Sequence, residues 1–297
     1  MQNTEQERQS WLKLTIIFLY ILAYGFLNVI GSENELNLNL DNEGMLNMLK
    51  ILQAVSVVLV FIIPAILFAT LWTNKKIHYL GVTTRPAFAT IILAGIGMIV
   101  AMPLINWLAE VNQNMHLPDA FSGIEIWMKN SEEKASQLTE AFTKGTSIST
   151  LVLNLFVVAF MAAVSEELFF RGMLQKVLIE CFKNKHIAIW IGAALFSAFH
   201  MQFYGFIPRM LMGAFLGYLF LWSGSLYASI VAHFVNNGMA VLLVWLSNKG
   251  SISVDIDKVG TNENELIFVA ISLVLVVASL FFICKLELKK KQKQLIE

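Results

Sequence analysis

Two adjacent carboxylates and an arginine stand out because they lie in an apolar part of the chain. The stretch VSEELFFRG carries Glu166, Glu167 and Arg171, and the run that leads to it, TLVLNLFVVAFMAAV, has no charge. An ionisable side chain inside a membrane span costs free energy and is a candidate for function. On a helix, Glu167 and Arg171 are four residues apart and can pair. Glu166 is rotated by about 100° from Glu167 and can turn toward the interior of a helix bundle.

Three further polar side chains follow in the next apolar runs. His200 ends the segment FSAFH, and the segment HFVNN carries His233 and Asn237, which are four residues apart on one helical face. Together with Glu166 they would surround one small cavity. A carboxylate there can take a proton from water and pass it to a leaving amine, while a histidine orients the water. A second histidine and an amide can donate hydrogen bonds to an oxyanion as it forms.

The same residues admit other interpretations. Glu166, His200 and His233 could instead bind Zn²⁺, because two histidines and one glutamate form a catalytic zinc set with an open fourth position. The sequence has no HExxH segment, which is the strongest signal for that metal. A membrane transporter or ion-binding protein could use the cluster as a proton or cation site, although the inverted repeat common in transporters is not evident. Structural roles, such as an ion pair or hydrogen bonds between helices, are a further alternative.

The composition predicts the elements that position these side chains. Of the 297 residues, 57% are hydrophobic and 14% are charged, and the mean hydropathy is +0.66. Soluble domains have about 25% charged residues, so we expect an all-α, polytopic integral membrane protein. Apolar runs of about 17–25 residues predict about eight transmembrane helices, with the active site between the helices of the second half. The runs lie at 11–31, 48–72, 89–110, 149–172, 187–204, 207–222, 225–246 and 265–284.

Lysine and arginine cluster in alternate connections of this arrangement. The segments 73–88 and 171–186 and the C-terminal tail are basic, whereas the loops 32–47 and 111–148 are acid-rich. The positive-inside rule then places both termini in the cytoplasm. The 111–148 loop also contains SEEKASQLTEAFTK, a polar helix that is either a solvated connector or a lid at a substrate entrance.

From the apolar runs and the clustering of ionisable side chains, we expect the chain to have three parts. Residues 1–148 form N-terminal transmembrane helices and an extracytoplasmic loop, 149–246 form the catalytic helical core, and 247–297 form the last helix and a basic cytoplasmic tail. Within the core, Gly213 and Gly217 of the segment GAFLG predict close helix packing.

Three motifs of the core carry a resemblance to a known family. EELFFR fits EExxxR, FSAFH fits FxxxH and HFVNN fits HxxxN, in this order. The segment GSL, residues 224–226, comes just before the third motif. Residues 149–240 thereby resemble the CAAX-prenyl-protease-type intramembrane proteases, also called the CPBP family and earlier the Abi family. The resemblance implies an integral membrane endopeptidase with an all-helical fold and a site that opens toward the cytoplasm.

The resemblance also implies roles for the matched residues. Glu166 would activate water with His200, and His233 with Asn237 would stabilise the oxyanion. The family has been described both as metalloproteases and as glutamate-type proteases. We expect the metal-independent mechanism, because Asn237 is a poor zinc ligand, and keep Zn²⁺ bound by Glu166, His200 and His233 as the alternative cofactor. Two residues that would support the structure are Glu167 and Arg171.

The partners and location follow from the same resemblance. We expect a peptide or lipidated-peptide substrate and a lipid bilayer, no nucleic acid, and an oligomeric state that the sequence leaves open. The chain would lie in a bacterial plasma membrane and process a peptide or bacteriocin, or confer self-immunity. A catalytically silent immunity or binding protein of the same fold is the alternative.

Overall fold

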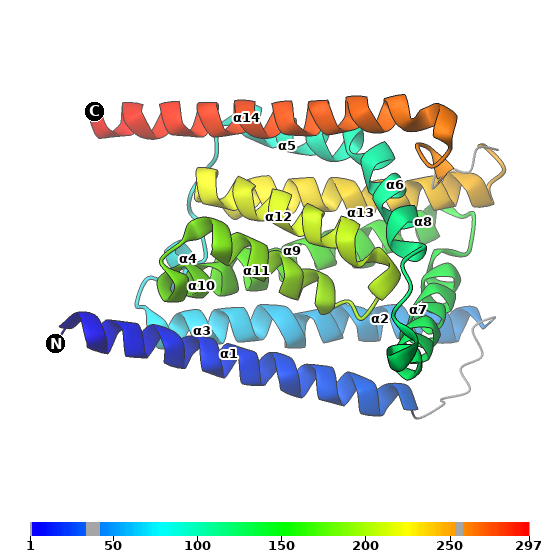
Figure 1. Ribbon diagram of the computed structural model, residues 1–297, viewed down its shortest axis with the longest axis horizontal. Helices are drawn as coiled ribbons and strands as arrows, with labels where there is room; N and C mark the ends of the chain where they lie inside the picture. The colour runs from blue at the N-terminus through cyan, green and yellow to red at the C-terminus, as the bar shows by residue number, and fades with distance from the viewer. Residues whose placement is uncertain (1, 34–41, 253–257, 297) are drawn as a thin grey trace.

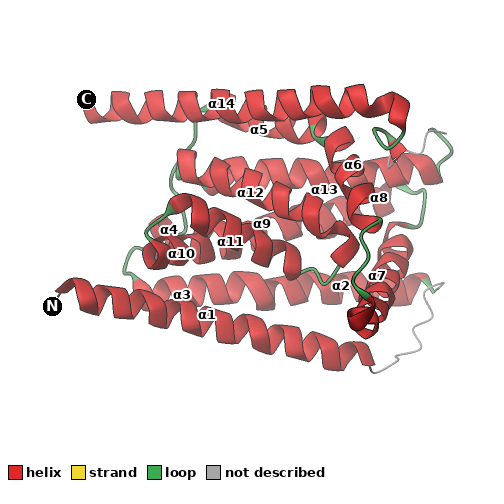
Figure 2. Cartoon of the chain, viewed as in Figure 1, coloured by secondary structure: helices red, strands yellow, loops and turns green. Residues whose placement is uncertain are grey.

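Long helices that run side by side make up this protein. The computed structural model describes residues 2–33, 42–252 and 258–296, and these contain no strand (Figures 1 and 2). In Figure 1, α1 begins and α14 ends at the same end of the bundle, which we call the terminal end. The opposite end, where α7 lies across the other helices, is the α7 end. The predicted all-α fold is confirmed, while residues 34–41 of the predicted acidic loop lie outside the described residues.

The chain passes back and forth between these two ends. Its α-helices are α1 (Gln2–Glu33), α2 (Glu43–Val57), α3 (Ile63–Trp72), α4 (Lys76–Tyr79), α5 (Phe88–Val100), α6 (Met102–Gln113), α7 (Ser122–Thr143), α8 (Ile148–Asn154), α9 (Ala162–Glu167), α10 (Gln175–Phe182), α11 (Lys185–Ala198), α12 (Phe206–Ser223), α13 (Leu226–Asn248) and α14 (Leu266–Ile296). Wider π-helical turns fill Val58–Ile62, Leu155–Met161 and Leu168–Leu174.

Several of these helices are long and apolar enough to cross a membrane. Five qualify among the described residues, and the pair of α5 and α6, which is bent by 47°, would make a sixth. The apolar α11 has 14 residues, fewer than the roughly 20 that a crossing needs. The chain is therefore a polytopic membrane protein, but the expected count of eight spans is not confirmed. The five spans are Gly44–Trp72, Ile148–Phe182, Phe203–Ser223, Leu226–Asn248 and Leu266–Gln294.

The helix that carries the glutamates is longer than the sequence indicated. It was expected to end at residue 172, but it continues to Phe182. The prediction was wrong because Arg171 resembles a loop charge in the sequence, whereas its side chain is buried inside the bundle. With a rise of 1.5 Å per residue, Glu166 lies about 24 Å from the end of this helix, and His200 lies about 22 Å beyond the start of α11. The two side chains therefore reach the same depth.

Two π-helical turns flank α9, the short segment that ends in Glu166 and Glu167. One covers Leu155–Met161 and the other Leu168–Leu174. Such turns inside an α-helix are rare and occur frequently at functional sites. Both glutamates are buried here, although an α-helix would rotate them by about 100° from each other. They can therefore contact different partners within one packed interior.

An aromatic and aliphatic core fills the bundle between the glutamates and the terminal end. The members of this core that lie nearest the site are at most 2% exposed. The rings of Phe170 and Phe196 meet edge to face with centroids 5.1 Å apart, so helices distant in sequence pack tightly here. The core residues nearest the site are Phe169, Phe170, Met173, Leu174 and Phe196.

The GAFLG segment brings α12 close to its neighbours, as the sequence predicts. A Cβ atom added to Gly213 would lie 3.2 Å from Ala193, and one added to Gly217 would lie 3.0 Å from Ile189. The close approach also exposes a backbone carbonyl, because Gly213 O accepts a hydrogen bond of 3.0 Å from Arg171 Nη2. The glycines thus position the arginine of the site as well as packing α11 against α12.

We expect Gly213→Ala to lower the stability of the protein by about 1–3 kcal/mol, because the added methyl group overpacks the contact with Ala193 and pushes the carbonyl away from Arg171. The midpoint of thermal aggregation in detergent measures this. Gly123→Ala in α7 is the matched control, since its added Cβ would meet no atom within 4 Å. A midpoint for Gly213→Ala equal to that of the control would contradict the prediction.

Candidate active site

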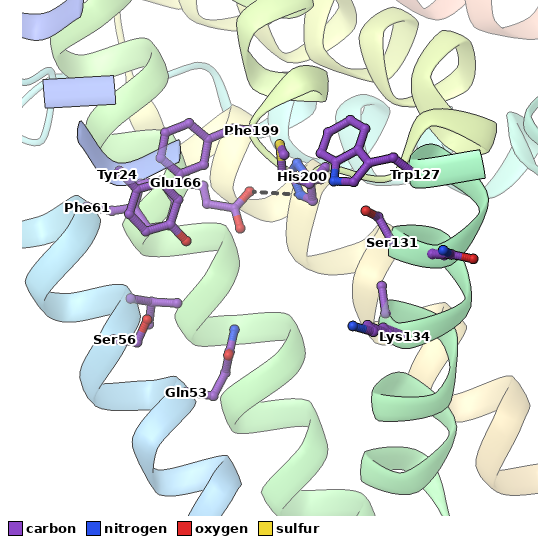
Figure 3. A pocket seen from close by; sticks show the side chains of 14 residues that line it. Tyr24, Gln53, Ser56, Phe61, Trp127, Ser131, Lys134, Glu166, Phe199 and His200 are labelled. Atoms are coloured by element: carbon purple, nitrogen blue, oxygen red, sulfur yellow. Dashed lines mark ion pairs between the residues drawn. The ribbon is translucent and has the colours of Figure 1, made fainter. Parts of the chain in front are cut away.

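The carboxylate of Glu166 is the centre of the polar cluster. Its side chain is buried, and Oε2 accepts no hydrogen bond from the described residues. Two imidazole nitrogens face this oxygen, His200 Nε2 at 3.8 Å and His233 Nε2 at 3.9 Å. Figure 3 shows Glu166 pointing toward His200. The structure thus brings together three residues that are widely separated in the sequence.

His200 lies in a turn directly beyond the end of α11. Its Nδ1 is 2.9 Å from the carbonyl oxygen of Phe196. Because a carbonyl only accepts, Nδ1 carries the hydrogen, and a neutral His200 presents the lone pair of Nε2 to Glu166. The next residue, Met201, has a φ of +54°, a conformation that non-glycine residues adopt rarely and that occurs at functional sites. This turn fixes the direction of the imidazole.

His233 is held by the second glutamate. It projects from α13, and its Nδ1 is 3.0 Å from Glu167 Oε1. The same oxygen accepts a hydrogen bond of 2.6 Å from Arg171 Nη1. Because this carboxylate oxygen is an acceptor, the hydrogen of its contact with His233 lies on Nδ1. A neutral His233 therefore presents the lone pair of Nε2 to Glu166. Arg171 thus contacts Glu167, Glu167 contacts His233, and His233 faces Glu166.

Arg171 is buried deep in the bundle and not at a membrane interface, where the sequence had suggested an ion pair at a helix end. Its side chain is 3% exposed and that of Glu167 is fully buried. The guanidinium also bonds Gly213 O and lies 4.6 Å from the ring centroid of Phe196. Removing one partner of a buried ion pair typically costs about 3–5 kcal/mol. The pair therefore supports both the helix packing and the orientation of His233.

Asn237 does not face this group. Its Nδ2 is 3.4 Å from the carbonyl oxygen of Val158, and its Oδ1 accepts a hydrogen bond of 3.1 Å from Asn236. Both ends of the amide are thus engaged between α13 and the π-helical turn at Leu155–Met161. Its role as an oxyanion donor stays a prediction that would require the side chain to turn.

A cavity of about 530 Å³ leads from Glu166 and His200 toward the α7 end. Its walls include Gln53 and Ser56 of α2, and Trp127, Ser131 and Lys134 of α7 (Figure 3). Sequence reasoning missed Gln53, Ser56 and Trp127, whereas Ser131 and Lys134 belong to the polar helix that it had suggested as a lid. A signal existed for two of the missed residues: Lys50, Gln53 and Ser56 are spaced three apart, which places polar groups on one face of an apolar helix.

The polar helix of the long loop is a wall of this cavity. Tyr204 N donates a hydrogen bond of 3.2 Å to Glu132, and the rings of Trp127 and Phe203 are 5.2 Å apart, so α7 is attached to the segment that follows His200. Near the start of α7, hydrogen bonds from Lys129 and then His116 hold the pKa of the Glu125 carboxyl at about 2. Of the two interpretations from the sequence, the contacts favour the substrate entrance.

The spacing of the cluster bears on the metal alternative. Two histidines and a glutamate are donors that zinc accepts, and ligand atoms around a tetrahedral zinc ion lie about 3.3 Å apart. The distances from Glu166 Oε2 to His200 Nε2 and His233 Nε2 are 3.8 and 3.9 Å. No group of three or more His, Cys, Asp or Glu side chains in the described residues has the geometry of a metal site. As they stand, these side chains do not fit zinc.

The segment that holds the cluster is similar to a known protein family. Residues 148–239 match the family model described as type II CAAX prenyl endopeptidase Rce1-like. The uncharacterized protein YpbD of Bacillus subtilis (strain 168) is 31% identical over 77 residues, which are 25% of this chain and 36% of that protein. The chain thus spans about a third of the length of this curated relative. No solved structure matches. The resemblance to CAAX-type prenyl endopeptidases is therefore confirmed for the segment that holds Glu166, His200 and His233.

Proposed function

We propose that this integral membrane protein is an endopeptidase that hydrolyses a peptide bond with water activated by Glu166 and His200. The observation that carries the proposal is the buried Oε2 of Glu166, which faces two imidazole nitrogens and accepts no hydrogen bond from the described residues. A buried carboxylate without a partner costs stability, so its position is best explained by chemistry. The match to the Rce1-like family supports a peptide as the substrate.

The first step would be attack by water. A water molecule can donate one hydrogen to Glu166 Oε2 and the other to His200 Nε2, because both atoms are acceptors. As the oxygen attacks the carbonyl carbon of the substrate, Glu166 takes the proton as general base. The carbonyl π electrons move to oxygen, which gives a tetrahedral oxyanion. Glu166 then returns the proton to the amide nitrogen as the C–N bond breaks, and the products are a carboxylic acid and an amine.

His233 would stabilise the oxyanion only in its charged form. Its Nδ1 hydrogen already points to Glu167, so Nε2 can donate a hydrogen bond only when both nitrogens are protonated. The carboxylate of Glu167 lies on the far side of the ring, with Oε1 3.0 Å from Nδ1. A charged donor aimed at the developing oxyanion is the kind of interaction that contributes most to acyl transfer. Asn237 is a second donor if its amide leaves Val158.

We expect peptide cleavage that does not depend on a metal ion, because the three side chains are too widely spaced for zinc. Protein in nanodiscs would be assayed with a panel of fluorogenic peptides, with and without a prenylated cysteine, before and after treatment with a chelator. Rates should agree within about twofold. Stoichiometric zinc, with activity lost on chelation and restored by zinc, would instead make Glu166, His200 and His233 ligands. Folded protein that cleaves no peptide would favour the silent immunity or binding protein.

The proposed location is a bacterial plasma membrane with both termini in the cytoplasm. The terminal end carries Arg85, Lys183 and Lys185 and the lysines of the C-terminal tail. Clustered Lys and Arg in short connections mark the cytoplasmic side. Within such a cell, peptide or bacteriocin processing and self-immunity are the roles we propose.

A further inference from the structure

We infer that the substrate reaches Glu166 from the α7 end, so that the peptide cleaved is one presented on the extracytoplasmic side of the membrane. This inference rests on the proposed function and on the proposed orientation of the termini. It departs from the cytoplasmic opening that the family resemblance implies. Three features of the bundle carry it: the polar path to the site, the closed core behind the site, and the distribution of basic residues.

The polar path runs in one direction only. From Glu166 and His200, the cavity passes Gln53 and Ser56 on α2 and reaches Asn130 and further polar side chains of α7. At 1.5 Å per residue, Gln53 lies about 15 Å inside the start of α2, between the glutamate and the α7 end. A peptide backbone needs hydrogen-bonding partners along its whole path through a membrane. Among the described residues, the polar side chains that line the cavity beyond Glu166 and His200 lie in this half of the bundle.

Behind the site, the route to the terminal end is closed. Phe169, Phe170 and Met173 follow the glutamates on the same helix and are at most 2% exposed. The ring of Phe61 lies 5.7 Å from that of Phe169 and 5.2 Å from that of Phe199, so aromatic side chains of three segments meet across this level. Interiors packed in this way leave no room for a hydrated chain.

An apolar groove opens in the same half of the bundle. It has a volume of about 500 Å³, lies between α1 and α11, and shares Tyr24, Phe199 and Met201 with the catalytic cavity. The rings of Tyr24 and Phe199 are stacked at 4.5 Å where the two spaces join. A peptide in the cavity can therefore place the apolar residues beside its cleaved bond in this groove, toward the bilayer, while it stays in the half of the bundle near the α7 end. The substrate class that fits is an exported or membrane-anchored peptide with apolar residues next to the cleaved bond.

The charges assign the α7 end to a side of the membrane. The α4–α5 connection with Arg85, the α10–α11 connection with Lys183, and the end of α14 with Lys290 and Lys291 lie at the terminal end (Figure 1). The long loop with α7 has more acidic than basic residues. The positive-inside rule makes the terminal end cytoplasmic. The entrance to the cavity then faces away from the cytoplasm.

The test is the accessibility of single cysteines in bacterial cells. In a protein with Cys181→Ala and Cys284→Ser, Asn130→Cys marks the cavity entrance and Gln294→Cys marks the exposed terminal end. A membrane-impermeant maleimide should label Asn130→Cys in intact cells at least tenfold more than Gln294→Cys, which should react only after permeabilisation. Labelling of Asn130→Cys only after permeabilisation would overturn the inference.

A second readout tests the route itself. In purified protein, a bulky maleimide on Asn130→Cys should lower kcat/KM for the peptide at least tenfold, and the same adduct on Gln294→Cys should not. An adduct at position 130 that leaves cleavage unchanged would overturn the route while the peptidase proposal stands. The labelling in cells requires no activity, so an inactive protein with the expected labelling would count against the proposed function alone.

Discussion

Glu166→Gln is expected to reduce peptide cleavage by about 10³-fold, within the range for loss of a general base, without lowering the melting temperature. Glutamine has the shape of glutamate, and its amide can donate toward the Nε2 lone pairs of His200 and His233, but it cannot take a proton from water. The buried carboxylate has no hydrogen bond to lose at Oε2. The variant should therefore be as stable as the natural protein or more stable, as expected where a site sacrifices stability for function.

Glu180→Gln is the matched control for this experiment. Glu180 lies on the same helix near the terminal end, where it pairs with Lys13 at 2.9 Å, far from the cavity. Its replacement should change the cleavage rate by less than about twofold, because this partly exposed pair does not contact the cavity. Steady-state kinetics and thermal unfolding of the three proteins measure both effects. A Glu166→Gln variant with more than a tenth of the natural rate would mean that another group activates the water.

The sequence predicts the central part of the site because ionisable groups are costly within apolar runs. Glu166, His200 and His233 stand out for this reason. The structure places Nε2 of each histidine within 4 Å of Glu166 Oε2. Asn237 is not ionisable and was selected for its amide and its spacing of four residues from His233. Its side chain nevertheless turns to Val158, because helical spacing fixes the face on which a residue lies but not the partner that its amide finds.

Other features depend on contacts between distant segments. The end of the glutamate helix was misplaced because Arg171 and Lys176 suggested a loop. Arg171 instead finds Glu167 and Gly213, and Lys176 donates a hydrogen bond to the carbonyl of Tyr79, so both charges are accommodated within the packed helix. The walls that α2 and α7 contribute to the cavity arise from long-range packing, which local periodicity does not encode.

Glu167→Gln is expected to lower kcat by about 10²–10³-fold with little change in KM, since a charged donor to an oxyanion acts only in the transition state. The glutamine oxygen can accept from both His233 Nδ1 and Arg171, as Glu167 Oε1 does. Its amide group replaces Oε2, which has no partner among the described residues. The orientation of His233 is thus retained, whereas the carboxylate charge beside its ring is lost.

Glu167→Asp separates this electrostatic role from a structural one. Aspartate is shorter and weakens the contacts to Arg171 and His233, but it keeps the charge. If the charge assists catalysis, Glu167→Asp should be at least tenfold faster than Glu167→Gln even where its melting temperature is equal or lower. If Glu167 only holds the helices together, rates should follow melting temperatures, and the more stable variant should be the faster one. The comparison of kcat with thermal stability across the two variants therefore decides whether Glu167 tunes His233 or merely supports it.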